Sequence, residues 1–205
     1  MIKEFFHFKK WEAFLGKTFS FLSPMAWTYI GFFFPLFGFI SVVMGKIWLA
    51  IIFFLLGGLL DEIDGKVARY SGRTSYWGGF VDGTVDRFTD FFFILSFYYL
   101  PFEIWYVDIS ILLLVLLFVT IMPPFIVAYA NHRKAVPDPT EKVIWRISFR
   151  AEYYAIFILV LFFSQIHLMT AFYCMLFALV LNGVTVIQAL ILAAIRTRDY
   201  PQQPE

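Results

Sequence analysis

Six long apolar segments constrain the fold of this chain of 205 residues more than any other feature of its sequence. Charged residues, proline or glycine separate them, and they cover residues 24–44, 47–60, 77–100, 109–130, 153–166 and 168–195. The whole chain is 61% hydrophobic, whereas soluble domains contain about 45–50% apolar residues. A backbone inside a bilayer must satisfy its polar groups internally, so such segments predict helices. We therefore expect an all-α membrane protein with six transmembrane helices.

The first 17 residues differ from these segments because lysines are interspersed with bulky apolar side chains. They contain neither a continuous apolar run nor a small-residue cleavage site, which argues against a secretory signal. We expect an amphipathic helix that lies in the membrane interface. Its apolar side would contain Ile2, Phe5, Phe6, Phe8, Trp11 and Leu15. A single membrane domain would then comprise an interfacial helix (1–17), a six-helix bundle (24–195) and a cytoplasmic tail (196–205).

Basic residues are concentrated on one side of the expected bundle. They precede the first segment, join the second to the third and the fourth to the fifth, and follow the sixth, whereas the opposite loops hold only Lys46. The positive-inside rule then predicts a multi-pass protein of the cell membrane with both termini and the charged loops in the cytoplasm. The formal net charge of +1 gives no reason to expect a nucleic acid partner.

Carboxylates lie within two of the apolar segments. Residues 47–60 form too short a helix, at about 1.5 Å per residue, to cross the roughly 30 Å of hydrocarbon, so this helix should continue into the charged stretch from Asp61. Likewise, few residues separate Asp90 from Glu103, which puts Asp82, Asp86 and Asp90 below the membrane surface. Ionisable groups at that depth cost about 2.5–3.5 kcal/mol each, and they are therefore candidates for function.

The spacing of these carboxylates predicts one shared site. On an α-helix, Asp61 and Asp64 lie on one stripe, and Asp82 and Asp86 lie on another. A short connection near residues 71–74 should make the two helices antiparallel neighbours. Four converging carboxylates would repel one another without a cation between them. Hard divalent ions prefer oxygen ligands, so we expect two Mg²⁺ or Mn²⁺ ions in this site.

The order of these residues resembles the signature of the CDP-alcohol phosphotransferase family. From Asp61 to Asp86 the chain reads Asp-x₂-Asp-Gly-x₂-Ala-Arg-x₈-Gly-x₃-Asp-x₃-Asp and agrees with the signature at every fixed position and in every gap. Ser23, Pro24 and Thr28 are similar to the family's Thr-Pro-Asn-x-x-Thr, with Met25 in place of asparagine. The resemblance also includes Ser75, Arg87 and Asp90 and extends over nearly the whole chain.

The resemblance implies a homodimer in which Asp61, Asp64, Asp82 and Asp86 ligate the two metal ions. It implies that Asp86 is the base that takes the proton of the acceptor hydroxyl, with Asp82 as the second catalytic residue. The residues that it assigns to CDP binding are Asp61, Gly65, Ala68, Arg69, Ser75, Gly78 and Asp82. The alternative, that the four aspartates are helix caps or ion-pair partners of nearby basic residues, does not require this spacing.

Arg133, Lys134 and Arg150 are candidates for binding the acceptor alcohol. They occupy places where family members with phosphorylated acceptors carry basic residues, although the positive-inside bias alone would also put them there. Tyr153 departs from the family's Arg-Pro/Ala-Glu-Arg at its final position. Inositol phosphate, serine and glycerol phosphate therefore all stay open as acceptors. For Asp90 we expect pairing with a basic residue and not metal binding.

The predicted function is transfer of a phosphatidyl-type group from a CDP-linked lipid to a small polar alcohol or a phosphorylated polyol, with release of CMP. Membrane lipids are the expected surroundings, and the donor tails could be acyl or ether-linked isoprenoid chains. An intramembrane prenyltransferase that uses Mg²⁺ is an alternative, but six helices and Gly65-x-x-Ala68-Arg69 argue against it. A proton-coupled transporter is a third hypothesis, but the sequence contains no inverted repeats.

Overall fold

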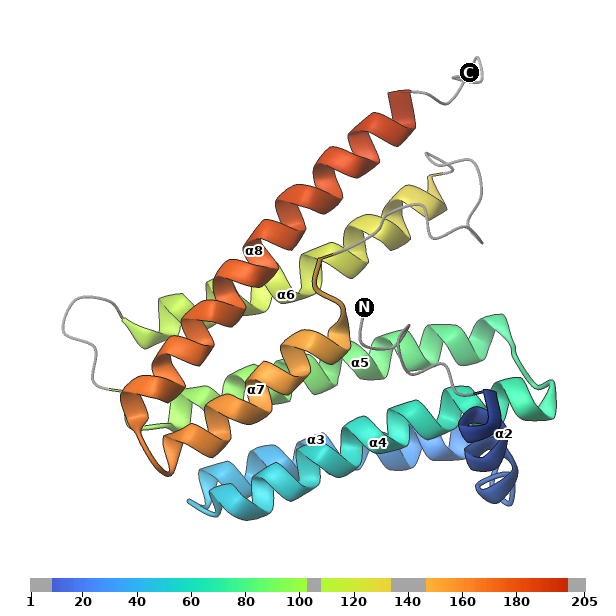
Figure 1. Cartoon of the computed structure of the whole chain (residues 1–205), viewed down its shortest axis with the longest axis horizontal. Helices are drawn as coiled ribbons and strands as arrows, with labels where there is room; N and C mark the ends of the chain where they lie inside the picture. The colour runs from blue at the N-terminus through green and yellow to red at the C-terminus, as the bar shows by residue number, and fades with distance from the viewer. Residues whose placement is uncertain (1–8, 103–107, 134–146, 199–205) are drawn as a thin grey trace.

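The computed structural model describes residues 9–102, 108–133 and 147–198, and every regular element in these ranges is a helix (Figure 1). This confirms the all-α class. The elements, in chain order, are α2 (Lys9–Thr18), α3 (Pro24–Val43), α4 (Ile47–Ser71), α5 (Tyr76–Ser96), the 3₁₀ helix η1 (Phe97–Tyr99), α6 (Ile109–His132), α7 (Arg150–Ser164) and α8 (Leu168–Arg198).

Local sequence signals set the ends of the helices around the candidate site. Helix α3 begins where the Ser23 hydroxyl accepts a hydrogen bond from the Ala26 N–H at 3.2 Å, with Pro24 in the first turn. Helix α4 continues through the charged stretch as expected, and it ends at Gly72, whose φ of 64° is left-handed. Helix α5 follows after Ser75, whose hydroxyl accepts from the Gly78 N–H at 3.0 Å.

Helix α7 begins earlier than the hydrophobic pattern predicts. The apolar segment starts at residue 153, but the helix starts at Arg150, because the Glu152 carboxylate accepts a hydrogen bond from the Phe149 N–H at 3.1 Å. Arg150 is therefore part of the first helical turn and not of the preceding loop, where the sequence analysis placed it. As a helical residue, Arg150 has a side chain whose direction relative to its neighbours is set by the helix.

Three of the described helices are long and apolar enough to cross a membrane: α3, α6 and residues 168–196 of α8. Helices α4 and α5 carry the carboxylates of the motif, and α7 has only 15 residues. The expectation of a membrane protein is thus supported by three spans, and the remaining three of the six expected spans stay a prediction.

Helix α3 packs against both α4 and α5, α7 packs against α4 and α8, and α6 lies beside α8 (Figure 1). An aromatic core joins the three central helices. Phe54 of α4 and Phe93 of α5 stack in parallel with centroids 3.9 Å apart, and the ring of Phe157 on α7 meets Phe93 edge-on at 5.4 Å. All three rings are fully buried, so they fix α4, α5 and α7 relative to one another.

Helix α2 lies across the end of α4 that leads into α5 (Figure 1). Gly16 permits this contact, because a Cβ at that position would lie 2.5 Å from the Cβ of Tyr70. The following linker is joined to α3 by the Trp27 indole N–H, which donates to the Phe19 carbonyl at 2.9 Å. The expected interfacial helix is thus helical over residues 9–18, while residues 1–8 lie outside the described part of the chain.

Candidate active site

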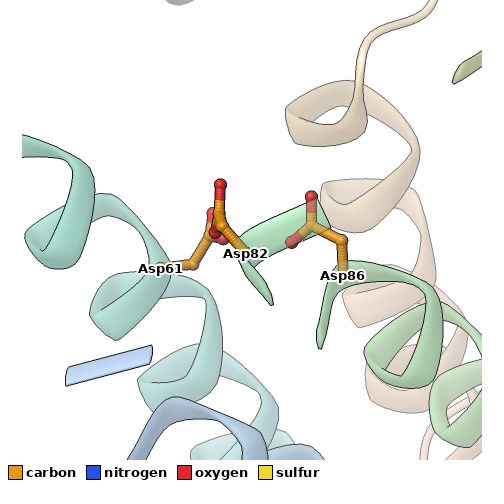
Figure 2. A group of neighbouring side chains, drawn as sticks. All are labelled: Asp61, Asp82 and Asp86. Carbon is orange, nitrogen blue, oxygen red and sulfur yellow. The ribbon is translucent and has the colours of Figure 1, made fainter. Parts of the chain in front are cut away.

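Three of the four motif aspartates converge as the sequence predicts. Asp61 extends from α4, and Asp82 and Asp86 extend from α5, with their carboxylates pointing toward one another (Figure 2). One oxygen atom of each carboxylate lies within 4.8 Å of those of the other two. We refer to Asp61, Asp82 and Asp86 as the carboxylate cluster.

The chemistry of the carboxylate cluster fits a divalent metal ion. Three carboxylate oxygens at this separation repel one another, and an ion that prefers oxygen ligands removes that repulsion. Both Mg²⁺ and Mn²⁺ have this preference, and neither requires nitrogen or sulfur ligands. All three side chains are partly buried, which strengthens their interaction with a cation compared with the same contact in water.

Asp64 behaves differently from the other three motif aspartates. Its carboxylate is buried and accepts a hydrogen bond from the hydroxyl of Thr28 on α3, at 2.6 Å. It is not one of the three residues of the carboxylate cluster, although it lines two cavities together with Asp82. The sequence placed Asp64 on the same stripe as Asp61, and it did not predict the contact with α3.

Arg150 reaches into the carboxylate cluster from α7. Its guanidinium Nη1 donates to the Asp61 carboxylate at 2.7 Å and also contacts the carboxylate of Asp86. Its Nε lies 3.8 Å from Asp90. One arginine thus bridges α4 and α5 at the point where their negative charges meet, which the sequence analysis did not predict.

Asp90 lies one turn beyond Asp86 on α5 and is fully buried. Its carboxylate pairs with Arg87 at 3.3 Å and accepts a hydrogen bond from the Tyr153 hydroxyl at 3.1 Å. The prediction that Asp90 pairs with a basic residue is therefore confirmed. Tyr153, the residue that departs from the family pattern, contributes an uncharged donor to this buried contact.

A cavity of about 420 Å³ opens beside the cluster, between the start of α3, the end of α4 and the start of α5. This volume is in the range of small-ligand sites. Its lining includes six of the seven residues assigned to CDP binding, all but Asp61. The lining residues are Ser23, Pro24, Met25, Thr28, Asp64, Gly65, Ala68, Arg69, Arg73, Thr74, Ser75, Gly78, Gly79 and Asp82. Asp61, which was also assigned to CDP binding, lines a second cavity of about 10 Å³. That volume holds about one water molecule.

Small side chains keep this cavity open. A Cβ at Gly78 would lie 3.1 Å from the Ser75 hydroxyl, which caps α5, and a Cβ at Gly65 would lie 3.4 Å from the Arg69 guanidinium. Arg73, in the connection between α4 and α5, was not predicted as a cavity residue, since a basic residue at this place also fits the positive-inside rule. With Arg69 it gives the cavity two guanidinium groups, which suit a phosphorylated ligand.

Of the two candidate acceptor residues that the structure describes, only Arg150 lies at the carboxylate cluster. Arg133 is exposed at the C-terminal end of α6 and lines neither of the two cavities. Lys134 lies outside the described residues. Arg150 is at the cluster, where its contacts are with carboxylates.

Comparison with known proteins agrees with this geometry. The sequence model of the CDP-alcohol phosphatidyltransferase family matches residues 21–195. The archaetidylinositol phosphate synthase of Pyrococcus horikoshii is 38% identical over 78 residues, which are 37% of this chain and 42% of that protein. The match thus spans less than half of that relative.

Two solved structures have the same fold. Both are of the phosphatidylinositol phosphate synthase of Mycobacterium tuberculosis. The structure with CDP-DAG bound has a TM-score of 0.73 at 21% identity, covering 89% of this chain and 92% of that chain. The structure in complex with manganese and citrate has a TM-score of 0.72 at 22% identity, covering 88% of each chain.

Proposed function

We propose, because the chain belongs to the CDP-alcohol phosphatidyltransferase family, that it transfers a phosphatidyl-type group from a CDP-linked lipid to the hydroxyl of a small polar acceptor and releases CMP. The observation that carries this proposal is the position of the 420 Å³ cavity. Its wall contains Asp64 and Asp82, so a ligand in the cavity lies directly beside the carboxylate cluster. The solved relative with CDP-DAG bound has the same fold and supports a CDP-linked donor.

Asp61, Asp82 and Asp86 would hold the divalent metal ions, with Asp64 as the fourth ligand. The preference of carboxylates for hard cations allows Mg²⁺ or Mn²⁺, two ions for each active site. Bound there, the ions would polarise the attacked phosphorus and neutralise charge on the leaving group. The manganese in a solved relative is consistent with this assignment.

The residues of the cavity would orient the donor. The guanidinium groups of Arg69 and Arg73 would bind the diphosphate, and Gly65, Ala68 and Gly78 would leave room for the nucleotide. The Asp86 carboxylate would take the proton of the acceptor hydroxyl. The acceptor oxygen then bonds to the β-phosphorus, the bond from that phosphorus to the bridging oxygen breaks, and CMP leaves with the α-phosphate.

Inositol phosphate is the acceptor that the relatives favour. The Pyrococcus relative is named an archaetidylinositol phosphate synthase, and the Mycobacterium relative is named a phosphatidylinositol phosphate synthase. A phosphorylated acceptor would use basic residues, for which Arg133, Lys134 and Arg150 are the candidates. Arg150 supports this role best among the described residues, because it lies next to the proposed base Asp86.

The proposed enzyme crosses the membrane six times, with both termini and the active site on the cytoplasmic side. Helices α4, α5 and α7 also expose large apolar side chains, which supports their contact with lipid. These include Trp48, Ile52, Leu55, Leu59, Phe88, Phe91, Leu159 and Phe162.

Two copies would form a homodimer. The open small-residue position Gly83 on α5 supports close helix approach there, since no atom lies within 4 Å of a Cβ at this position.

The experiment is CMP release by the purified protein in lipid micelles. We expect CMP only when a CDP-linked lipid, a divalent ion and inositol phosphate are all present. Serine and glycerol phosphate are offered in its place as the alternative acceptors. Asp82→Asn and Asp86→Asn should each abolish release. Asp108→Asn is the matched control, because Asp108 caps α6 away from the cluster and asparagine caps equally well. Unchanged turnover in either cluster variant would contradict the proposal.

A further inference from the structure

The Asp64 side chain is held by a contact with the Thr28 hydroxyl on a neighbouring helix. Asp64 and Thr28 are 36 positions apart in the chain, on α4 and α3, yet both are buried and their oxygens are 2.6 Å apart. Such a short distance is typical of a hydroxyl that donates to an ionised carboxylate. One of the two Asp64 oxygens, Oδ2, is therefore engaged with the protein.

The geometry around the Thr28 hydroxyl shows which acceptor receives its proton. Its oxygen lies 2.6 Å from Asp64 and 3.2 Å from the Pro24 carbonyl of its own helix. A hydroxyl carries one proton, and both neighbours are acceptors, so the shorter contact receives it. Thr28 itself is fixed, because it lies in the second turn of a helix that Ser23 caps and Pro24 begins.

The contact with Thr28 limits how Asp64 can bind a metal ion in the proposed site. With Oδ2 held by the Thr28 hydroxyl, the orientation of the Asp64 carboxylate is restrained, and the lone pairs that Thr28 does not use remain for a metal ion. Residues that hold a metal ligand in this way typically change metal affinity about 10–100-fold when they are removed. The position of Thr28, in the lining of both cavities beside the carboxylate cluster, is suited to this role.

We propose that Thr28 is a positioning residue, which orients the Asp64 carboxylate for metal binding through its hydroxyl. The inference rests on the proposed function, since it assumes that Asp64 is a metal ligand. It adds a residue on a third helix, α3, to a site whose carboxylates all come from α4 and α5. The position of α3 against α4 would then influence metal affinity directly.

The test is a titration of the purified protein with Mn²⁺, in which free Mn²⁺ is measured by electron paramagnetic resonance, so that no turnover is needed. Thr28→Val removes the hydroxyl at nearly constant volume, and Thr28→Ser retains it. We expect the dissociation constant for Mn²⁺ to rise at least about tenfold in Thr28→Val and to stay within about twofold in Thr28→Ser.

Thr185→Val is the matched control. Thr185 is a buried threonine whose hydroxyl donates only within its own helix, to the Leu181 carbonyl at 2.8 Å, and its loss should leave Mn²⁺ affinity unchanged. If Thr28→Val does not fold, Thr28→Ala provides the same comparison. Tight Mn²⁺ binding by the folded variant without the hydroxyl would overturn the positioning role alone. Absence of Mn²⁺ binding by the unchanged protein would instead overturn the proposed metal-dependent function and this inference with it.

Discussion

The guanidinium of Arg150 on α7 lies 2.7 Å from the carboxylate of Asp61 on α4. The same guanidinium contacts Asp86 on α5, so a single cation joins the two helices that carry the motif. This contact balances part of the negative charge of the carboxylate cluster. A divalent ion bound by the cluster would balance the same charge, so the two cations should partly substitute for each other in stabilising the fold.

Arg150→Gln should therefore destabilise the protein most when no divalent ion is present. Removing one partner of a mostly buried ion pair costs roughly 3 kcal/mol, at the lower end of the usual range because the Arg150 side chain is 20% exposed. We expect a lower unfolding temperature in EDTA and a partial recovery when Mn²⁺ is added. Thermal unfolding followed by tryptophan fluorescence measures both.

Arg196→Gln is the control for this prediction, since Arg196 is exposed near the end of α8. It should leave the unfolding temperature unchanged with and without Mn²⁺. Equal unfolding temperatures for Arg150→Gln and the unchanged protein in EDTA would show that the bridge between α4 and α5 contributes nothing to stability.

The sequence predicted the helices and the face of each motif residue because these follow from periodicity. Residues 24–44 became α3 over Pro24–Val43, and the continuation of α4 past Asp61 followed from its short apolar length. Arg150 was harder, because a charged residue before an apolar segment resembles a loop residue, and the Glu152 cap that draws it into α7 gives a weak signal.

The contacts that link distant helices could not be predicted from spacing. A stripe on one helix gives a direction but does not identify the residue that meets it from another helix. Thr28 contacts Asp64 across 36 positions, and Tyr153 contacts Asp90 across 63. Each depends on how α3 or α7 packs, which is decided by burial of the whole bundle and not by any local pattern.

The aromatic core explains why three helices bring their functional residues to one level. Asp61, Asp86 and Arg150 each lie seven residues, or about two helical turns, from Phe54, Phe93 and Phe157. Residues seven positions apart lie on nearly the same face of a helix, so contact among the three rings aligns the three charged groups. The distance between the ring layer and the charged layer is then the same on all three helices.

Tyr154→Phe should loosen the contact of α7 with α4 next to this core. The Tyr154 hydroxyl donates to the Phe54 carbonyl at 2.7 Å, and Gly58 leaves the space for its ring. Loss of one such hydrogen bond costs about 1 kcal/mol in the free energy of unfolding. Denaturant unfolding measures the loss. Tyr98→Phe, at an exposed tyrosine of η1, should change stability by much less, and an equal effect of both changes would contradict the assignment.

Gly16→Ala should displace α2 from α4. The added Cβ would lie 2.5 Å from the Cβ of Tyr70, which no rotation of the tyrosine side chain relieves. Overpacking of this kind costs about 1–3 kcal/mol, so cleavage by trypsin after Lys17 should become about fivefold faster or more. Mass spectrometry of the digest measures the rate. Gly183→Ala adds the same methyl group where no atom lies within 4 Å, and it should leave the rate unchanged.

A double-mutant cycle should detect a polar contact between α6 and α8. The Asn182 side-chain amide donates to the Thr120 hydroxyl at 3.0 Å, and that hydroxyl donates in turn to the Leu116 carbonyl at 2.7 Å, so its one proton and one of its two lone pairs are used. Both side chains are buried in helices that are apolar enough to span a membrane. Hydrogen bonds between membrane helices contribute about 1 kcal/mol.

For Thr120→Val and Asn182→Leu we expect a coupling energy of about 1 kcal/mol in unfolding titrations with mixed detergent micelles. Each single variant removes the shared bond, so the second change costs less once the first has been made. Thr120→Val combined with Ser41→Ala is the control pair, because Ser41 donates only to the Phe37 carbonyl of α3, and these two effects should add. Additive effects for Thr120 and Asn182 would mean that apolar packing alone holds α6 and α8 together. Ile126, Ala130 and Ala189 form such an apolar contact between the two helices nearer their ends.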